Sequence, residues 1–327
     1  MRAASTIPQY EVVPNWAQIP AGWDLVEVPG LAVDSQDRIF AFTRGEPSVV
    51  VFDRKRVVLS SWGTGLFRRP HALFIDPDDC VYCVDDLGHS VRKFTADGKL
   101  LATIGPSGSP SETGFVPNDF LSIKCGGPPY NQPTSVALAP SGELYVTDGY
   151  GNSRVHTFSP EGELLFSWGE PGCGPGEFHL VHDVAVDSQG RVYVGDRMNS
   201  RVQVFTPDGK YLTEWNDAYQ PSGVYIDAHD RAYLAEIGYR ADLPMPGPLP
   251  PPEDRYSRVT VRDLTGRILA SITNADPGAP GGFLSAHAVV CDSRGDIYVG
   301  EVSATRARNQ GKDRHAFNIL QKFRCPS

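Results

Sequence analysis

The stretch Pro133–Gly169, PTSVALAPSGELYVTDGYGNSRVHTFSPEGELLFSWG, decides the fold of this 327-residue chain. It holds four short runs of alternating apolar residues, separated by turns rich in Gly, Pro, Asp and Asn. The stretch Val181–Asn216, VHDVAVDSQGRVYVGDRMNSRVQVFTPDGKYLTEWN, repeats the pattern. Two such units in succession indicate a repeat architecture in which each unit is a small sheet of four strands.

The same pattern can be followed along the whole chain. It predicts six units, at approximately 30–63, 71–105, 133–169, 181–216, 221–273 and 286–325. The last unit ends one strand short, and residues 10–18, YEVVPNWAQ, precede the first unit as a spare strand. We therefore expect a single all-β domain over 1–327, a six-bladed β-propeller. Its N-terminal strand would complete the last blade and so remove the exposed sheet edges.

Composition and termini limit the partners of the protein. The formal net charge is −9, and this acidic excess argues against a nucleic acid partner. No run reaches the ~18–20 apolar residues of a membrane helix, so no membrane partner is expected. The first residues lack the apolar core of a signal peptide, which predicts a cytoplasmic protein. A monomer is expected because the blades of a closed ring pair their own edges. Free thiols are expected for the six cysteines, Cys80, Cys83, Cys125, Cys173, Cys291 and Cys325.

Three segments are longer than the repeat requires. They are residues 106–132 between the second and third units, 240–257 within the fifth and 304–316 within the sixth. Propeller strands run alternately up and down, so all three insertions should rise on one face of the ring. Long loops gathered on one face usually mark a site.

Three histidines share one position in the repeat. His71, His182 and His287 each stand at the start of the first strand of their unit, in units two, four and six. First strands line the channel of a propeller, and alternate blades of a six-bladed ring are about 120° apart. Three converging imidazoles with open positions suit a catalytic zinc ion or another divalent transition metal. The alternative is that each histidine serves a network of channel water. The remaining histidines share no such register and are expected at the surface or in packing; they are His89, His156, His179, His229 and His315.

The loops after the second strands lie on the same face as the histidines. Arg44 in the first unit and Arg197 in the fourth occupy equivalent offsets, and Tyr150 follows one residue later in the third. Arginine binds carboxylates in a bidentate manner, so the two arginines suit an anionic substrate. Nearby positive charge favours a phenolate, which makes Tyr150 a candidate general base.

Several motifs resemble the NHL-repeat family of peptidyl-α-hydroxyglycine α-amidating lyases, over approximately residues 24–325. They are HALFID around His71, DGYGNSR around Tyr150, GEFHLVHDVAVD around His182, GDRMNSRVQVF around Arg197 and GGFLSAHAVVCDSRGDIYVGE around His287, with FTRGE around Arg44. The resemblance implies that the three histidines hold zinc, that the tyrosine acts as base, and that both arginines lie in the active site. It also implies the reaction. The C–N bond of an N-acyl-α-hydroxyglycine is cleaved to a primary amide and glyoxylate, and the partner is a small anionic hydroxylated amide.

The sequence departs from the family at three positions. Ser285 replaces a methionine two residues before His287, Ala288 replaces an aspartate after it, and Gly151 replaces a cysteine after the tyrosine. The aspartate belongs to the family's structural calcium site, so a calcium ion here would rely on backbone contacts such as Leu73. Two other functions stay open: a zinc-dependent hydrolase or hydratase acting on a small anionic molecule, and a non-catalytic NHL binding scaffold.

Overall fold

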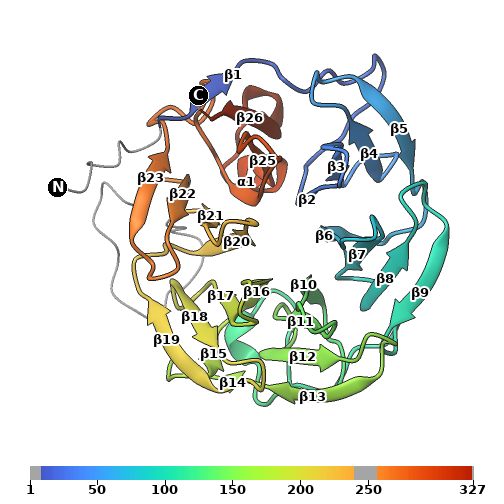
Figure 1. Ribbon diagram of the computed structural model, residues 1–327, viewed down its shortest axis with the longest axis vertical. Coiled ribbons are helices and arrows are strands. Elements are labelled where there is room, and N and C mark those ends of the chain that lie inside the picture. Colours follow the sequence, from blue (N-terminus) through green and yellow to red (C-terminus); the bar gives the residue numbers. More distant parts are fainter. Residues whose placement is uncertain (1–8, 239–255, 326–327) are drawn as a thin grey trace.

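The computed structural model describes residues 9–238 and 256–325. Six four-stranded antiparallel sheets stand around a central channel, which confirms the propeller (Figure 1). The first three blades are β2 (Gly30–Val33), β3 (Ile39–Phe42), β4 (Val49–Phe52) and β5 (Val58–Trp62); β6 (Pro70–Ile75), β7 (Val81–Asp85), β8 (Ser90–Phe94) and β9 (Leu100–Ile104); and β10 (Pro133–Leu138), β11 (Leu144–Asp148), β12 (Arg154–Phe158) and β13 (Leu164–Trp168).

The other three blades have the same order of strands. They are β16 (Val181–Val186), β17 (Val192–Asp196), β18 (Arg201–Phe205) and β19 (Tyr211–Trp215); β20 (Pro221–Ile226), β21 (Ala232–Glu236), β22 (Arg258–Arg262) and β23 (Ile268–Ile272); and β24 (Ala286–Cys291), β25 (Ile297–Glu301), β26 (Leu320–Arg324) and β1 (Glu11–Val13). In each of the first five blades, the first strand lies innermost and the fourth lies at the rim (Figure 1).

The sixth blade is made from both ends of the chain. β1 pairs antiparallel with β26, with Val12 opposite Phe323. Trp16 then packs between the last and first blades, 4.9 Å from the ring of Tyr298 and 5.6 Å from that of Phe52. The N-terminal arm therefore supplies the outer strand of the last sheet and a buried aromatic wedge at the seam.

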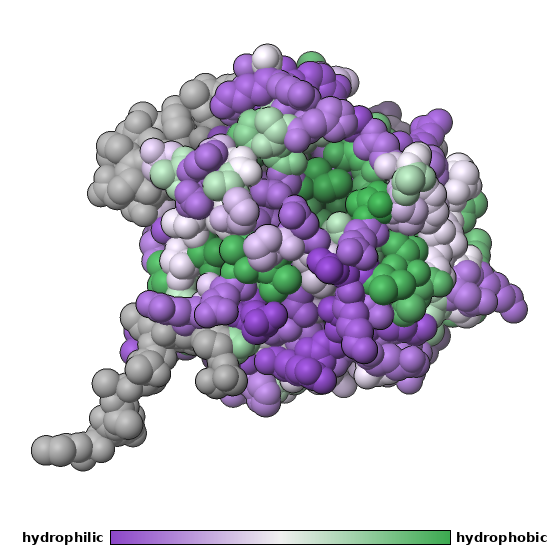
Figure 2. Space-filling view, turned by 90° about the horizontal axis from the view of Figure 1, so that it is seen from above, coloured by the Kyte–Doolittle hydropathy of each residue, from purple (hydrophilic) through white to green (hydrophobic). Residues whose placement is uncertain are grey.

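Each sheet buries both faces against its neighbours, so the second strands consist almost entirely of buried residues. The fourth strands instead expose large apolar side chains such as Leu59, Leu101 and Leu212. Figure 2 shows apolar patches between hydrophilic regions on one face of the molecule. The apolar core is thus divided into clusters along the blades and their interfaces.

Short elements fill the insertions. Residues 106–132 contain the 3-10 turn η1 (Phe120–Ser122), and the β25–β26 connection holds helix α1 (Ser303–Asn309) and η3 (Arg314–Ala316). A two-stranded parallel pair, β14 (Glu170–Pro171) and β15 (Glu177–Phe178), lies between the third and fourth blades. Most of the 240–257 insertion lies outside the described residues.

No disulfide joins any of the six cysteines, all of which lie in the described part of the chain, as expected. Among the described residues, no helix has the length and apolar character needed to cross a membrane.

Candidate metal centre and active site

A β-bulge aims each of the three histidines. The register of the first two strands shifts between Pro70 and Ala72, and His71 is the extra residue between them. His182 and His287 occupy the same bulge in their blades. A bulge turns one side chain away from the regular alternation of a strand. The bulge at the start of the first strand thus explains why the three imidazoles meet on the channel axis.

The three imidazoles form a compact buried cluster. His71, His182 and His287 are each at most 3% exposed, and their ring centroids are 4.8 to 5.0 Å apart. Each offers one ligand nitrogen, and these nitrogens all lie within 4.8 Å of one another. The sequence prediction that they converge is confirmed by this geometry.

A carbonyl of the neighbouring blade fixes the orientation of each ring. The Nδ1 atom of His71 lies 2.6 Å from the carbonyl oxygen of Thr134, and that of His182 lies 2.7 Å from that of Ser222. The Nδ1 atom of His287 lies 2.8 Å from the carbonyl oxygen of Pro29. A carbonyl can only accept, so each Nδ1 carries the hydrogen and each Nε2 has a free lone pair. Metal-binding histidines usually donate their other ring N–H to a carbonyl or carboxylate in this way.

The three Nε2 lone pairs have too few hydrogen-bond donors around them. The Tyr150 hydroxyl lies 3.1 Å from Nε2 of His71 and 3.2 Å from Nε2 of His182, but it has a single proton to donate. The buried Nε2 of His287 has no hydrogen-bond partner among the described residues. An unsatisfied buried acceptor is costly, and a cation bound between the three nitrogens would remove that cost. The residues present therefore fit a metal ion.

Burial keeps the three histidines neutral. It lowers the pKa of His71 and of His182 well below the usual value. Burial, and then the charges of Arg44 and Arg197, lower the pKa of His287 to about 3. Neutral imidazole is the form that binds a metal.

Two close backbone approaches position Tyr150. A Cβ atom on Gly149 would lie 1.8 Å from the carbonyl oxygen of Val181, the residue before His182. A Cβ atom on Gly151 would lie 2.2 Å from the side chain of Asn131. Only glycine fits at either position, so the loop carrying the tyrosine sits directly on the strand that carries a histidine.

The two arginines lie where the repeat predicts them. Nε of Arg44 donates to the carbonyl oxygen of Pro70 at 3.2 Å, and its Nη1 donates to the buried carboxylate of Glu27 at 2.7 Å. Arg197 is 6% exposed, and its backbone N–H donates to the carbonyl oxygen of Leu180. The charges of both arginines lower the pKa of His287, so both lie near the three-histidine cluster.

A third arginine belongs to the same site, and the sequence analysis did not identify it. The guanidinium of Arg69 lies 5.3 Å from the centre of the Tyr150 ring. Its Nε donates to both carboxylate oxygens of buried Asp86, at 2.6 and 2.8 Å. The sequence did contain a clue to it. Asp86, the partner of Arg69, comes directly after the second strand of its blade, at the position that Arg197 has in the fourth blade.

The insertions reach the site as well. The Phe120 ring in η1 lies 5.7 Å from that of Tyr150. Glu27, which pairs with Arg44, also accepts a hydrogen bond from the backbone of Thr305 in α1. Leu73 lies in β6 two residues after His71 and is 6% exposed. A calcium contact through its carbonyl stays a prediction.

Known proteins with similar sequences carry NHL repeats or are named as amidating enzymes. The NHL repeat model matches residues 130–158 and 178–205, in the third and fourth blades. The chain is 34% identical over 207 residues to peptidyl-glycine alpha-amidating monooxygenase of Mus musculus, over 53% of this chain and 20% of that protein. It is 36% identical over 112 residues to peptidyl-alpha-hydroxyglycine alpha-amidating lyase 1 of Drosophila melanogaster, over 33% of this chain and 18% of that protein. The chain is thus a six-bladed propeller with NHL repeats in its third and fourth blades, and part of it is similar to amidating lyases.

Other relatives of this NHL-repeat propeller carry no reaction in their names. NHL repeat-containing protein 3 of Mus musculus is 32% identical over 181 residues, which cover 52% of this chain and 49% of that protein. The chain thus spans about half of that relative and about a fifth of the monooxygenase. Among solved structures, a streptogramin B lyase aligns over 98% of this chain and 97% of its own, with a TM-score of 0.59 and 10% identity. That likeness concerns the fold alone.

Proposed function

We propose that this protein is a zinc-dependent lyase that cleaves the C–N bond of an N-acyl-α-hydroxyglycine-like substrate. The products would be a primary amide and glyoxylate or a related carbonyl compound. One observation carries the proposal: three buried imidazoles present unprotonated Nε2 atoms beside the hydroxyl of Tyr150. Relatives named as amidating lyases support the same reaction.

His71, His182 and His287 would hold the metal through Nε2, since Nδ1 of each is engaged by a carbonyl. When bound, zinc supplies Lewis acidity, which polarises the substrate hydroxyl and makes its proton easier to remove. Three protein ligands are the number typical of a catalytic zinc site with an open position.

Tyr150 would act as the base. As phenolate it takes the proton of the substrate hydroxyl, the oxygen electron pair forms the new C=O bond, and the C–N bond breaks with its electrons moving to nitrogen. The proton now on the Tyr150 oxygen can then return to the amide nitrogen, so that atoms and charge balance. Arg69 lies over the ring of this tyrosine and so places a positive charge beside the proposed base.

Arg44 and Arg197 would bind the carboxylate that becomes part of glyoxylate. Arg44 is held by Glu27 and by the carbonyl of Pro70, so its guanidinium is fixed before substrate arrives. A fixed clamp lowers the entropic cost of orienting the reacting bond. The insertions beside the site would contact the acyl group.

Metal analysis and product detection test the proposal together. We expect purified protein to bind a stoichiometric amount of zinc and to release glyoxylate from N-acyl-α-hydroxyglycines. Glyoxylate can be followed by a coupled dehydrogenase assay, with the unhydroxylated N-acylglycine as control substrate. Zinc-loaded protein that releases none from any hydroxyglycine would contradict the lyase assignment.

Two alternatives depend on specific observations. A metal ion held by the three histidines could also activate water at an open coordination position, which would make the protein a hydrolase or hydratase on a small anionic molecule. Such an enzyme would act on substrates without a hydroxyl beside nitrogen. The match to NHL repeat-containing protein 3 favours a binding scaffold, and a chain that takes up no metal when zinc is added would favour it further.

A further inference from the structure

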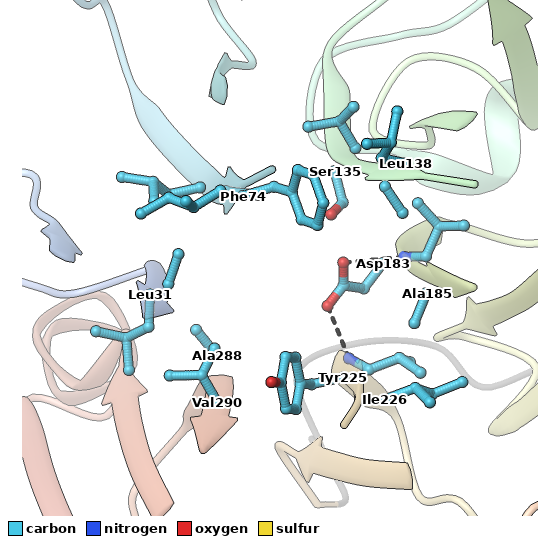
Figure 3. Close-up of a pocket in the computed structure, with 18 of the residues that line it drawn as sticks. Leu31, Phe74, Ser135, Leu138, Asp183, Ala185, Tyr225, Ile226, Ala288 and Val290 are labelled. Carbon is cyan, nitrogen blue, oxygen red and sulfur yellow. Dashed lines mark hydrogen bonds between the residues drawn. The ribbon is translucent and has the colours of Figure 1, made fainter. Parts of the chain in front are cut away.

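A second cavity lies on the other side of the imidazoles. The central channel encloses about 600 Å³, a volume typical of small-molecule sites, and is walled by the first strands of the blades (Figure 3). The three histidines close one end, and exposed Ser35 and Ser188 mark its opening at the far face. Tyr150 is not among its lining residues, so this space is separate from the proposed reaction site.

The lining of this channel carries charge of one sign. Every side chain along it that carries a full charge at neutral pH is an aspartate, and no Lys or Arg of the described residues lines it. Near the opening, Asp76 pairs with Lys93 and Asp187 pairs with Arg191 from outside the channel. The interior therefore favours positive ligands over negative ones.

Asp183 is the aspartate nearest the histidines, because it follows His182 in β16. Its carboxylate accepts from the backbone N–H of Val224 at 2.7 Å and from that of Val184 at 2.9 Å. Both donors are neutral, and no cationic side chain of the described residues pairs with it in an ion pair. Asp183 is half-buried in the wall of the channel, and a positive ligand there would supply the opposite charge that the carboxylate lacks.

Two aromatic rings face the same space. Phe74 in β6 and Tyr225 in β20 come from blades that stand opposite each other in the ring (Figures 1 and 3). Each lies two residues further along its strand than the position that Asp183 holds in β16, so both rings lie toward the opening. Small residues such as Ala288 line the wall between. The result is a chamber with a carboxylate, two aromatic rings and apolar walls.

We propose that this chamber binds an organic ammonium ion, with the positive nitrogen at Asp183 and its alkyl groups against Phe74 and Tyr225. Aromatic faces attract alkylammonium groups, and the apolar wall favours their methyl groups. The competing occupant is calcium, which needs six to eight oxygen ligands and would have to combine this carboxylate with backbone carbonyls such as that of Leu73. The inference is independent of the lyase proposal, because it concerns the opposite side of the histidines.

Two probes of equal shape and different charge test the proposal. Choline and its neutral carbon isostere, 3,3-dimethyl-1-butanol, would be titrated into the zinc-loaded full chain by calorimetry. We expect saturable choline binding, and binding of the isostere weaker by about tenfold or more, the effect of one charge-assisted contact. Equal affinity for both probes, or no saturable binding of choline, would overturn the proposal.

Variants locate the site. Asp183→Asn should weaken choline binding about tenfold, whereas Asp208→Asn, which removes the same charge from an exposed turn, should leave it unchanged. Zinc content and melting temperature would verify that the variants fold. If Asp183→Asn does not fold, Phe74→Leu should weaken binding about fivefold through loss of the cation–π contact. Unchanged choline affinity in the folded variant would refute the assignment. So would displacement of choline by millimolar calcium chloride but not by other alkylammonium ions.

Discussion

Replacing Tyr150 by phenylalanine removes one oxygen from the centre of the proposed reaction. That oxygen lies 3.1 and 3.2 Å from the Nε2 atoms of His71 and His182. The ring keeps its contacts, because Arg69 lies over its face and Phe120 packs beside it. The variant should therefore fold, and it should still bind zinc, because the tyrosine is not one of the three ligand residues.

The loss of activity can be estimated from the role of the hydroxyl. A positioned general base contributes about 10²- to 10⁴-fold, or about 2.7–5.5 kcal/mol of transition-state stabilisation. Stability should change by only about 1 kcal/mol, the usual net worth of one hydrogen bond. Tyr150→Phe should thus lower kcat by at least a hundredfold and leave KM nearly unchanged, since the carboxylate clamp of the arginines is intact.

The assay is glyoxylate release at saturating substrate, with zinc content measured on the same samples. Tyr130→Phe is the control, because the hydroxyl of buried Tyr130 donates to the carbonyl of Ile104, away from the three histidines. The control should retain wild-type turnover. Full activity in zinc-loaded Tyr150→Phe would remove this residue as the base, and loss of zinc would show that the hydroxyl serves the metal site instead.

Three more predictions follow from metal binding, ring closure and burial. His287→Ala should abolish zinc binding measured by mass spectrometry, while His229→Ala on the surface should retain it; zinc in both would contradict the three-histidine site. Trp16→Ala should lower the free energy of unfolding in urea by about 3–5 kcal/mol, because the 3% exposed indole packs on aromatic rings of the first and last blades. The control is Leu59→Ala, which truncates an exposed side chain. An equally small change in both variants would refute this reasoning. Burial raises the pKa of Glu301 to about 7 from 4.5, so the folded state keeps a proton that the unfolded state releases. This proton should stabilise the folded state by up to about 3 kcal/mol below pH 4.5, and the stabilisation should be lost as the pH rises through 7. In urea unfolding, the free energy of unfolding of Glu301→Gln should lack this dependence on pH. Parallel plots of unfolding free energy against pH for the variant and the wild type would count against the prediction.

The repeat made the ring and the convergence of the three histidines predictable from sequence. Each unit carries the same turns and alternation, so equivalent positions could be compared directly, and His71, His182 and His287 stood out as the same position in alternate units. Their convergence then follows from the symmetry of the ring. The bulge that aims them was not foreseen, because it leaves no mark in the apolar pattern.

Contacts between loops and insertions that do not repeat along the chain could not be predicted by comparing the units. Arg69 reaches the ring of Tyr150 only because Asp86, in the next loop, directs its guanidinium there. Glu27 joins Arg44 to α1, although 278 residues separate it from Thr305. Such pairs depend on where loops of different blades meet in space, and no periodic signal in the sequence encodes that.

The hydrogen bonds from the histidines to neighbouring carbonyls have a consequence for how a metal ion would be held. Even-numbered blades carry the ligand rings, and the odd-numbered side of each interface orients them through Thr134, Ser222 and Pro29. All six repeats therefore share a single binding event. Fraying of any blade would misalign an imidazole, so metal affinity and the cooperativity of the whole ring are thermodynamically linked. An ion bound in this way would also stabilise blades that it does not touch.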